Sequence, residues 1–349
     1  MWVRMNSDQS DWSQYIMLLP TQTPLYKLSQ TNWCWSTFIA PTFLAAPIAA
    51  KRKSVADEFE WLKSIEPVMN LFEALNATVS DYEWASSCYL TRVMDIPTSS
   101  GNLKAVVPII DFCNHSATPN AFWEFDASQP PSIILKANAD GIAEGEEVCI
   151  SYGTQITNAE LLFLHGFASP DTSIVSSRLP LPFMELAGVS SDSLPGGYWL
   201  KKDLIDRFGL PRSVFLMHHK SSQSLSNESN PLANFISDQV FLSLIVCVLV
   251  PGTELDIVDG GIAYRLANDV FPASRNAFEH VLSTSPLKHE LHLRVFETLL
   301  GVVSAKLNTM PHHTTTSKPD QLVDSLVIFY KEQIALFQDL HTELTNIIK

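Results

Sequence analysis

Two short motifs constrain the fold of this 349-residue chain more than any other feature. The first is Asp111–Ser116 (DFCNHS), followed closely by Pro119-Asn120, and the second is Gly145–Gly153 (GEEVCISYG). In each motif the polar residues follow a short apolar run, as expected where a strand opens into a loop. The two motifs therefore predict a β-rich region that presents polar side chains where its strands end.

The residues around the motifs fit this prediction. Gly, Pro, Asn and Asp punctuate short apolar runs, which is typical of hairpins and turns. A short helix is expected directly after the second motif, over Asn158–Phe167. The expected strands are Lys104–Ile110, Ala121–Phe125, Ile133–Ala137 and Glu147–Tyr152.

Helical periodicity dominates on both sides of this region. Between Val55 and Leu75 apolar side chains recur at helical spacing, and Pro67 predicts a kink or a break there. Near the C-terminus, a stripe from Leu326 to Ile347 predicts one amphipathic core helix. Polar loops are expected at 219–231 and 308–320. The fold class is therefore α+β, with an all-α part after about residue 172.

The composition narrows the class of protein. Hydrophobic residues make up 46% of the chain and charged residues 17%, which is enough for a substantial core. The formal net charge of −14 argues against nonspecific nucleic-acid binding, because that binding depends on neutralising phosphates. Net charge mainly serves solubility, although an acidic surface also suits a basic partner.

The cysteines and apolar runs exclude two further classes. The five cysteines are scattered and form no CxxC pair, so we expect a reducing compartment, no disulfide framework and no metal. The apolar run 33–50 is interrupted by Pro41 and Pro47. The run 240–250 is too short for a hydrocarbon core of about 30 Å. Both are expected to be buried segments of a protein that does not cross a membrane.

In this order and at this separation, the two motifs resemble the signature segments of the SET domain, the fold of protein-lysine methyltransferases. Two further segments, Asn158–Leu162 with Gly166-Phe167 and Trp84-Ala85 with Thr91-Arg92, resemble one subfamily. That subfamily contains the Rubisco large-subunit methyltransferase, its animal relatives and fungal ribosomal-protein lysine methyltransferases. The resemblance implies methyl transfer from S-adenosylmethionine to a lysine of a protein, with ribosomal proteins as one candidate class.

The resemblance also implies a domain organisation. Residues 1–172 would form a SET domain with a helical insert at about 21–100, and residues 173–349 an α-helical substrate-binding domain. The family's Gly-x-Gly pair has no counterpart before Tyr152, since the first glycine is Gly101. The SET domain is therefore expected to lack its N-terminal part. A monomer located in the cytoplasm or nucleus is expected.

Site residues follow from the same resemblance. Tyr152 corresponds to the catalytic tyrosine, which would orient the amine. His165, where the subfamily often has a tyrosine, and Cys113 would line the substrate channel. The residues expected to hold the cofactor are Asp111, Asn114, His115, Thr91, Arg92 and Phe167.

The chemistry that this resemblance implies needs neither a metal nor an acid–base pair. Lysine has an ordinary pKa of about 10.4, and its amine must arrive neutral. A narrow apolar channel beside a cationic sulfonium lowers that pKa by desolvation and like-charge repulsion. The protein then mainly has to align amine, methyl group and sulfur.

Simpler interpretations remain open for each residue. Tyr152 could be a core tyrosine at a strand end, and Asn114–Ser116 an ordinary polar turn. Phe167 could serve packing alone, and Arg92 could lie on the surface. For the whole chain, one alternative is a catalytically inactive SET-derived protein-binding module. Another is an all-helical scaffold, which would require that 104–153 contain no strands.

Overall fold

The computed structural model describes residues 10–20, 35–98, 101–128, 130–181, 197–220, 230–258, 263–310 and 321–349. The chain divides into two compact units. The first unit consists of residues 1–173 and 316–329, and the second of residues 174–315 and 330–349. The long helix α11 (Gln321–Ile348) therefore contributes to both.

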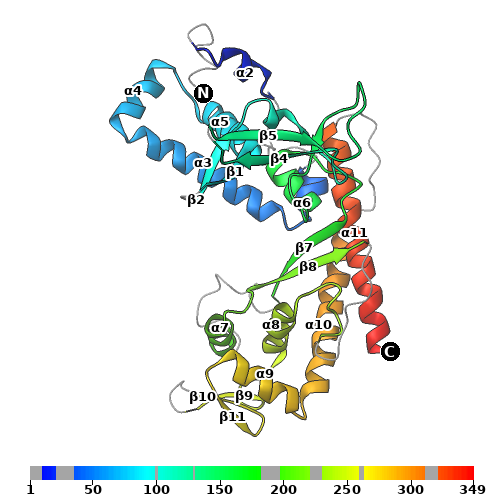
Figure 1. The fold of residues 1–349 in the computed structure, drawn as a ribbon. Coiled ribbons are helices and arrows are strands. Elements are labelled where there is room, and N and C mark those ends of the chain that lie inside the picture. Colours follow the sequence, from blue (N-terminus) through cyan, green and yellow to red (C-terminus); the bar gives the residue numbers. More distant parts are fainter. Residues whose placement is uncertain are drawn as a thin grey trace. The chain divides into compact units, whose positions relative to one another are not determined.

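Helices make up the N-terminal half of the first unit (Figure 1). The predicted break near Pro67 is confirmed, because α3 ends at Lys63 and α4 begins at Glu66. Proline is tolerated in the first turn of a helix, where its missing N–H has no intrahelical acceptor. Phe59 of α3 stacks on Phe72 of α4 with ring centroids 5.2 Å apart. The helical elements are α2 (Ser13–Leu18), the π-helical turn η3 (Trp35–Ile39), α3 (Ala45–Lys63), α4 (Glu66–Ala74) and α5 (Val79–Arg92).

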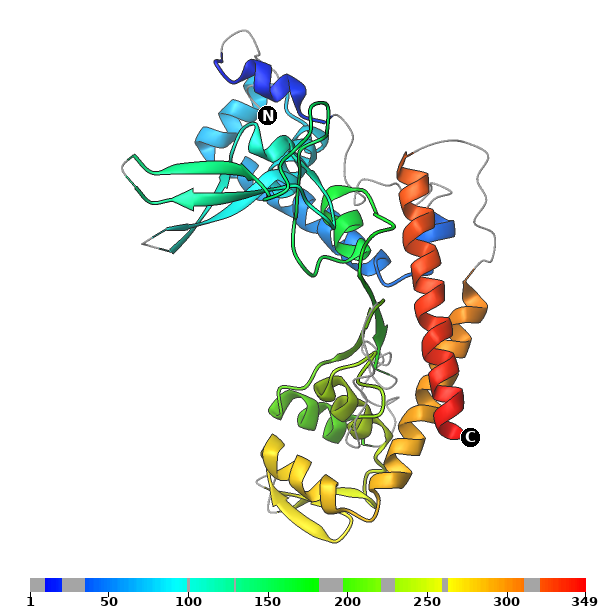
Figure 2. The ribbon, with the colours of Figure 1, turned by 45° about the vertical axis from the view of Figure 1, so that its right-hand side comes forward.

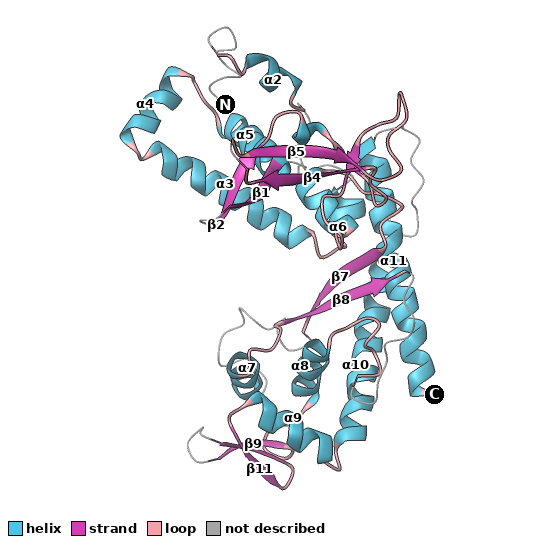
Figure 3. Cartoon of the chain, in the orientation of Figure 1, coloured by secondary structure: helices cyan, strands magenta, loops and turns pink. Residues whose placement is uncertain are grey.

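Short strands follow α5 (Figure 3). They pair as two antiparallel hairpins, β1–β2 and β4–β5, and as one parallel pair, β3–β6. Each strand is short, so the sheet pairs are small and the side chains between them complete the packing. The strands are β1 (Val93–Thr98), β2 (Gly101–Val106), β3 (Asn114–His115), β4 (Ala121–Asp126), β5 (Ser132–Ala137) and β6 (Cys149–Ile150).

Two of the predicted strands are shorter than expected. The strand predicted over Lys104–Ile110 ends at Val106, because the chain then turns into the 3-10 turn η4 (Ile110–Phe112). The strand predicted over Glu147–Tyr152 is reduced to Cys149–Ile150. The helix predicted over Asn158–Phe167 consists of α6 (Asn158–Glu160) and a π-helical turn, η5 (Leu161–His165).

The second unit is largely helical, as predicted, but it also contains strands (Figure 2). The hairpin β7–β8 and the three-stranded sheet β11-β10-β9 correct the expectation of an all-α part. The sheet packs against α9. In β10, Tyr264 and Leu266 are buried and Arg265 between them is exposed, which is the alternation of a half-buried strand. Runs of four residues are too short for this alternation to be recognised in the sequence.

The elements of the second unit have the following bounds. Its strands are β7 (Ile174–Pro180), β8 (Ser213–His219), β9 (Leu255–Val258), β10 (Ala263–Leu266) and β11 (Asp269–Pro272). Its helices, besides α11, are α7 (Tyr198–Arg207), α8 (Asp238–Val248), α9 (Arg275–Thr284) and α10 (Lys288–Thr309).

Two of the predicted apolar segments are core helices. The run 240–250 falls mostly in α8, whose residues Val240–Cys247 are all buried. The stripe of α11 is confirmed, since Leu326, Tyr330, Phe337, Leu340 and Leu344 are buried. Among the described residues, no helix combines the length and apolar character that crossing a bilayer requires. Of the two predicted loops, residues 221–229 and 311–320 lie outside the described residues, and Asn308 belongs to α10.

Candidate active site

The two sequence motifs lie side by side in the first unit. β3 and β6 pair in parallel, with Asn114 opposite Cys149 and His115 opposite Ile150. The Asn120 carboxamide adds a bridge, because its Oδ1 accepts from the Cys149 N–H at 2.9 Å and its Nδ2 donates to the Glu147 carbonyl at 2.9 Å. The motifs therefore form one structural element, although the hairpin β4–β5 separates them in sequence.

Tyr152 is anchored at both its backbone and its hydroxyl. Its N–H donates to His115 Nδ1 at 3.1 Å, and its hydroxyl donates to the Cys113 carbonyl at 2.9 Å. Burial raises the pKa of Tyr152, so the hydroxyl stays protonated near neutral pH. A hydroxyl that donates one hydrogen bond still has lone pairs to offer to a neighbour. Tyr152 is thus suited to orient a group, not to remove its proton.

Three rings surround the Tyr152 ring. The centroid of His165 lies 4.6 Å away, that of His115 5.3 Å and that of Phe167 6.4 Å. Burial lowers the pKa of His165 to about 4, with smaller contributions from the charges of His115 and Arg92. Burial likewise lowers the pKa of His115. At neutral pH this cluster is therefore an uncharged aromatic wall.

A buried ion pair lies beside the cluster. The Asp111 side chain is fully buried, and that of Arg92 is 15% exposed. Arg92 Nη1 donates to the Asp111 carbonyl at 2.6 Å and to its Oδ2 at 3.2 Å. Tyr15 of α2 donates its hydroxyl to the same Oδ2 at 2.5 Å. Arg92 is therefore not a surface residue, and its charge is compensated where it is buried.

The backbone is strained just before Asp111. Ile109 has φ 77° and ψ −52°, which a β-branched residue rarely adopts, and its side chain is exposed. The turn η4 follows directly, and η4 places Phe112 and Cys113 in two different core clusters. Strain of this kind persists only where the surrounding structure holds it. Here it sets the direction of the segment that carries Asp111 and the Cys113 carbonyl.

Several of these groups line a pocket of about 430 Å³. Six predicted residues line it: Thr91, Arg92, Asp111, Cys113, Tyr152 and His165.

The other three predicted residues do not line this pocket. His115 and Phe167 lie behind it, in the ring cluster. Asn114 is exposed, and its Nδ2 donates to Glu147 Oε1 at 2.5 Å. The Thr91 hydroxyl is occupied within its own helix, where it donates to the Ser87 carbonyl at 2.9 Å.

Three residues that shape the site were not assigned a role from the sequence. Tyr15 contacts Asp111 across 96 residues, a separation that no local pattern reveals. Trp123 of β4 lines the pocket and packs on the core cluster of Cys113, Ala121 and Ile150. Asn120 was part of the first motif, but its bridging role appears only once β3 and β6 pair. Within the described part of the chain, no cluster of His, Cys, Asp and Glu could hold a metal ion.

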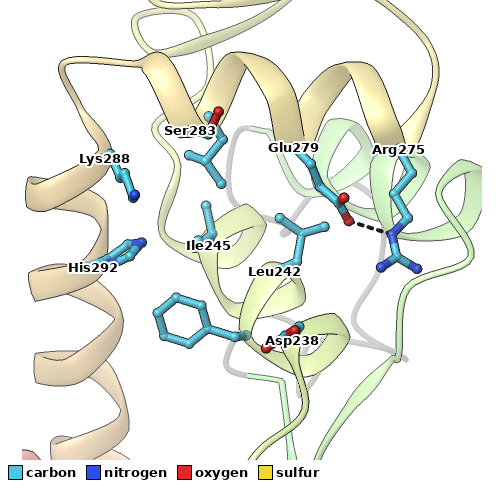
Figure 4. Close-up of a pocket in the computed structure, with 10 residues that line it drawn as sticks. Asp238, Leu242, Ile245, Arg275, Glu279, Ser283, Lys288 and His292 are labelled. Carbon is cyan, nitrogen blue, oxygen red and sulfur yellow. Dashed lines mark hydrogen bonds and ion pairs between the residues drawn. The ribbon is translucent and has the colours of Figure 1, made fainter. Parts of the chain in front are cut away.

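A second pocket, of about 240 Å³, lies in the other unit (Figure 4). Its apolar floor comes from α8, with Leu242 and Ile245, and the Arg275–Glu279 ion pair of α9 borders it. Lys288 and His292 of α10 border it as well, and burial lowers the pKa of His292. None of the predicted site residues belongs to this pocket.

Comparison with known proteins identifies the first unit. Residues 4–153 match the family model described as SET domain. This part of the chain is a SET domain. The resemblance drawn from the motifs is thereby confirmed, and so is an α+β fold with a helical C-terminal part.

One curated relative is the actin-histidine N-methyltransferase of Callithrix jacchus, which is 28% identical over 223 residues. The match covers 61% of this chain and 34% of the relative, so the chain spans about one third of the relative's length. The chain therefore has a relative in sequence that is named for histidine, not for lysine.

Solved structures share the fold of the whole chain. The SET domain of LSMT bound to MeLysine and AdoHcy has a TM-score of 0.65 at 16% identity, covering 99% of this chain and 74% of that chain. Rubisco LSMT bound to AdoMet has a TM-score of 0.65 at 16% identity, covering 99% and 73%. At this identity the similarity establishes the fold alone.

Proposed function

We propose that this chain is an S-adenosylmethionine-dependent protein methyltransferase whose active site is the Tyr152 pocket. The observation that carries the proposal is the Tyr152 hydroxyl, which is fixed by the Cys113 carbonyl in the wall of a pocket within a SET domain. The hydroxyl is neutral, because burial raises its pKa. Alignment of the acceptor nitrogen with the methyl group is the main catalytic contribution expected from such a site.

The chemistry of the pocket wall fits the cofactor. Two polar atoms of the ion pair, Arg92 Nε and Asp111 Oδ1, are buried without a hydrogen-bond partner among the described residues. A zwitterionic amino-acid end satisfies both, since its carboxylate accepts from the guanidinium and its ammonium donates to the carboxylate. S-adenosylmethionine supplies a methyl group bound to a sulfonium.

The proposed acceptor is a lysine amine. The LSMT structures that share this fold were solved with lysine or methyllysine bound, which supports this choice. The amine must lose its proton to solvent before transfer, and desolvation by the apolar part of the pocket wall lowers its pKa. Neither His165 nor Tyr152 is proposed as the base. Burial lowers the pKa of His165 to about 4, which makes it too weak a base for an amine, and burial raises the pKa of Tyr152, so its hydroxyl stays protonated.

A histidine acceptor is the second candidate, because the curated relatives at 28% identity are named actin-histidine N-methyltransferases. An imidazole is already largely neutral at pH 7, so it needs no deprotonation in the pocket. The pH dependence of the rate separates the candidates. Transfer to lysine should accelerate well above pH 8, whereas transfer to histidine should level off above about pH 7. Mass spectrometry of the modified residue decides the matter directly.

The second unit is proposed to bind the protein substrate, and ribosomal proteins and actin are the first substrates to assay. An inactive protein-binding module remains the competing hypothesis. It predicts that a folded sample neither binds S-adenosylhomocysteine in a calorimetric titration nor transfers a methyl group to either substrate.

Tyr152→Phe tests the role of the hydroxyl. It should lower the rate of transfer by about 100-fold, the usual cost of removing one hydroxyl or N–H that orients reacting groups. Affinity for S-adenosylhomocysteine should stay within about threefold, because the ring and its neighbours remain. The matched control is Tyr82→Phe, which removes a hydroxyl bonded to Glu58 from a half-buried tyrosine elsewhere in the same unit. Full transfer by Tyr152→Phe would refute the assignment.

A further inference from the structure

The Arg92 guanidinium is held by one edge only. Its Nη1 donates both hydrogen bonds to Asp111, at 2.6 Å to the carbonyl and 3.2 Å to Oδ2. Its Nε is buried without a partner in the described part of the structure, and so is Asp111 Oδ1. Arginine and a carboxylate commonly pair through two parallel hydrogen bonds. Something therefore keeps this pair from closing into that geometry.

Tyr15 is the group placed to do so. Its hydroxyl donates to Asp111 Oδ2 at 2.5 Å, the same oxygen that Arg92 approaches at 3.2 Å. The two donors share one carboxylate oxygen, and the tyrosine holds the shorter contact. Because the carboxylate is fully buried, no water competes for that oxygen.

Packing fixes the Tyr15 ring independently of its hydroxyl. The ring lies edge-on to Trp12, with centroids 6.3 Å apart, and tilted against Phe112 at 5.4 Å. It adjoins the core cluster of Leu19, Trp84 and Cys88. Arg92 lies over the other ring of this group, with its guanidinium carbon 5.2 Å from the Phe112 centroid. The contacts of the ring therefore orient the hydroxyl toward Asp111.

We infer that Tyr15 is a positioning residue which prevents Arg92 from closing onto Asp111 and so keeps the Nε edge of the guanidinium available for a ligand carboxylate in the Tyr152 pocket. The inference rests on the proposed function, in which that carboxylate belongs to the amino-acid end of the cofactor. Without the tyrosine hydroxyl, Oδ2 of the buried carboxylate loses a donor. Arg92 is the nearest replacement and would close into the forked pair.

The experiment compares two ligands by calorimetric titration. S-adenosylhomocysteine carries the carboxylate, and 5′-methylthioadenosine is a nucleoside thioether without the amino-acid end. The wild-type protein should bind the first on the order of tenfold or more tightly than the second, the effect of hydrogen bonds to a charged group. In Tyr15→Phe this preference should fall to about twofold, while the affinity for 5′-methylthioadenosine stays unchanged.

Tyr82→Phe is the matched control. Tyr82 also donates to a carboxylate, that of Glu58, and burial raises its pKa to about 12. It lies in the same unit but does not line the pocket. The control should keep the wild-type preference between the two ligands, even if it lowers the melting temperature as much as Tyr15→Phe does.

A cycle with Arg92→Lys makes the test independent of stability. An ammonium cannot donate two parallel hydrogen bonds to a carboxylate, as a guanidinium can. Arg92→Lys alone should therefore lose the preference for S-adenosylhomocysteine over 5′-methylthioadenosine. Adding Tyr15→Phe to Arg92→Lys should change this preference no further. Losses that add in the double variant would overturn the inference. So would an equal weakening of both ligands by Tyr15→Phe, or a wild-type protein without the preference. A wild-type protein that binds neither ligand would instead refute the proposed function itself.

Discussion

At the scale of single residues, the site is built from titratable groups that burial keeps neutral. Burial raises the pKa of Tyr152 and of the Cys113 thiol, and it lowers the pKa of His115 and His165. Charge in this wall is carried by the Arg92–Asp111 pair and by Asp95, which pairs with Lys104. Such a site suits alignment of a substrate and does not suit proton transfer by a side chain. The chemistry is therefore expected to respond to the ionisation of the substrate more than to that of the protein.

His165 gives a pH prediction for stability. Its pKa is about 4 in the folded protein and about 6.5 when unfolded, so between these values only the unfolded state takes up the proton. The free energy of unfolding should therefore fall as the pH drops from 6.5 to 4, by roughly 3 kcal/mol from this group, and this contribution should level off below pH 4.

Denaturant titrations across this range check the prediction. The comparison is with His165→Phe, which keeps a ring beside Tyr152 and Phe167 but cannot take up a proton. The difference in stability between wild type and variant should change between pH 6.5 and 4. A difference that stays constant with pH would show that His165 does not titrate as its burial beside His115 and Arg92 implies.

At the scale of elements, the short turn η4 connects the two halves of the site. It begins after the strained Ile109 and delivers Asp111 to Tyr15 and Arg92, and the Cys113 carbonyl to Tyr152. The turn has only three residues, so a change in backbone conformation at Ile109 is expected to move both Asp111 and the Cys113 carbonyl. The turn is therefore expected to be sensitive to backbone changes although Ile109 itself is exposed.

Ile109→Gly tests this strain. Glycine adopts positive φ without steric cost, and the Ile109 side chain is exposed, so little packing is lost. The variant should gain roughly 1 kcal/mol in free energy of unfolding, measured by chemical denaturation. Asn76→Gly, at another positive φ in the same unit, is the control and should gain less, because asparagine tolerates this conformation. A destabilised Ile109→Gly would mean that the turn carries no such strain.

The sequence predicted the elements with clear periodicity and missed those without it. The helices around Pro67 and the stripe of α11 follow from residue spacing. β1 was missed because it begins at Val93, directly after α5 ends at Arg92, and neither Gly nor Pro marks the boundary. In the site, Thr91, Arg92, Asp111, Cys113, Tyr152 and His165 come together as the motifs suggested.

The remaining features of the site depend on tertiary structure. Tyr15 contacts Asp111 and Trp123 lines the pocket, and neither contact could be predicted from local sequence patterns. Asn114 was expected to hold the cofactor, but its side chain bonds to Glu147, a partner that becomes available only when β3 and β6 pair. Its assignment to cofactor binding stays a prediction, as do the assignments of the other site residues.

At the scale of the whole molecule, the Tyr152 pocket and the α8–α10 pocket belong to different compact units. Every residue that lines the first pocket comes from the segment 90–165, within the first unit. A ligand in it stabilises the state that binds it, by about 2.7 kcal/mol at a concentration 100 times its Kd. That stabilisation is expected in the segments that line the pocket, not throughout the chain.

Hydrogen exchange measures this distribution. Excess S-adenosylhomocysteine should slow exchange in peptides that cover 90–95, 110–113, 150–152 and 164–165, the segments of the wall. Peptides of α8, α9 and α10 serve as the internal reference and should not change. Protection confined to that reference would place the ligand in the other pocket and contradict the proposed site.

The parallel pairing of β3 with β6 has one more consequence. Asn114 pairs with Cys149 and His115 with Ile150, so the segments before and after the hairpin β4–β5 lie next to each other at the site. The hairpin between them reaches the site through Asn120 and Trp123, while none of the described residues between Asp126 and Ser132 lines the pocket. That turn can lengthen or shorten without altering the geometry at Tyr152. It is the place in the SET domain to insert an epitope tag or a fluorescent label.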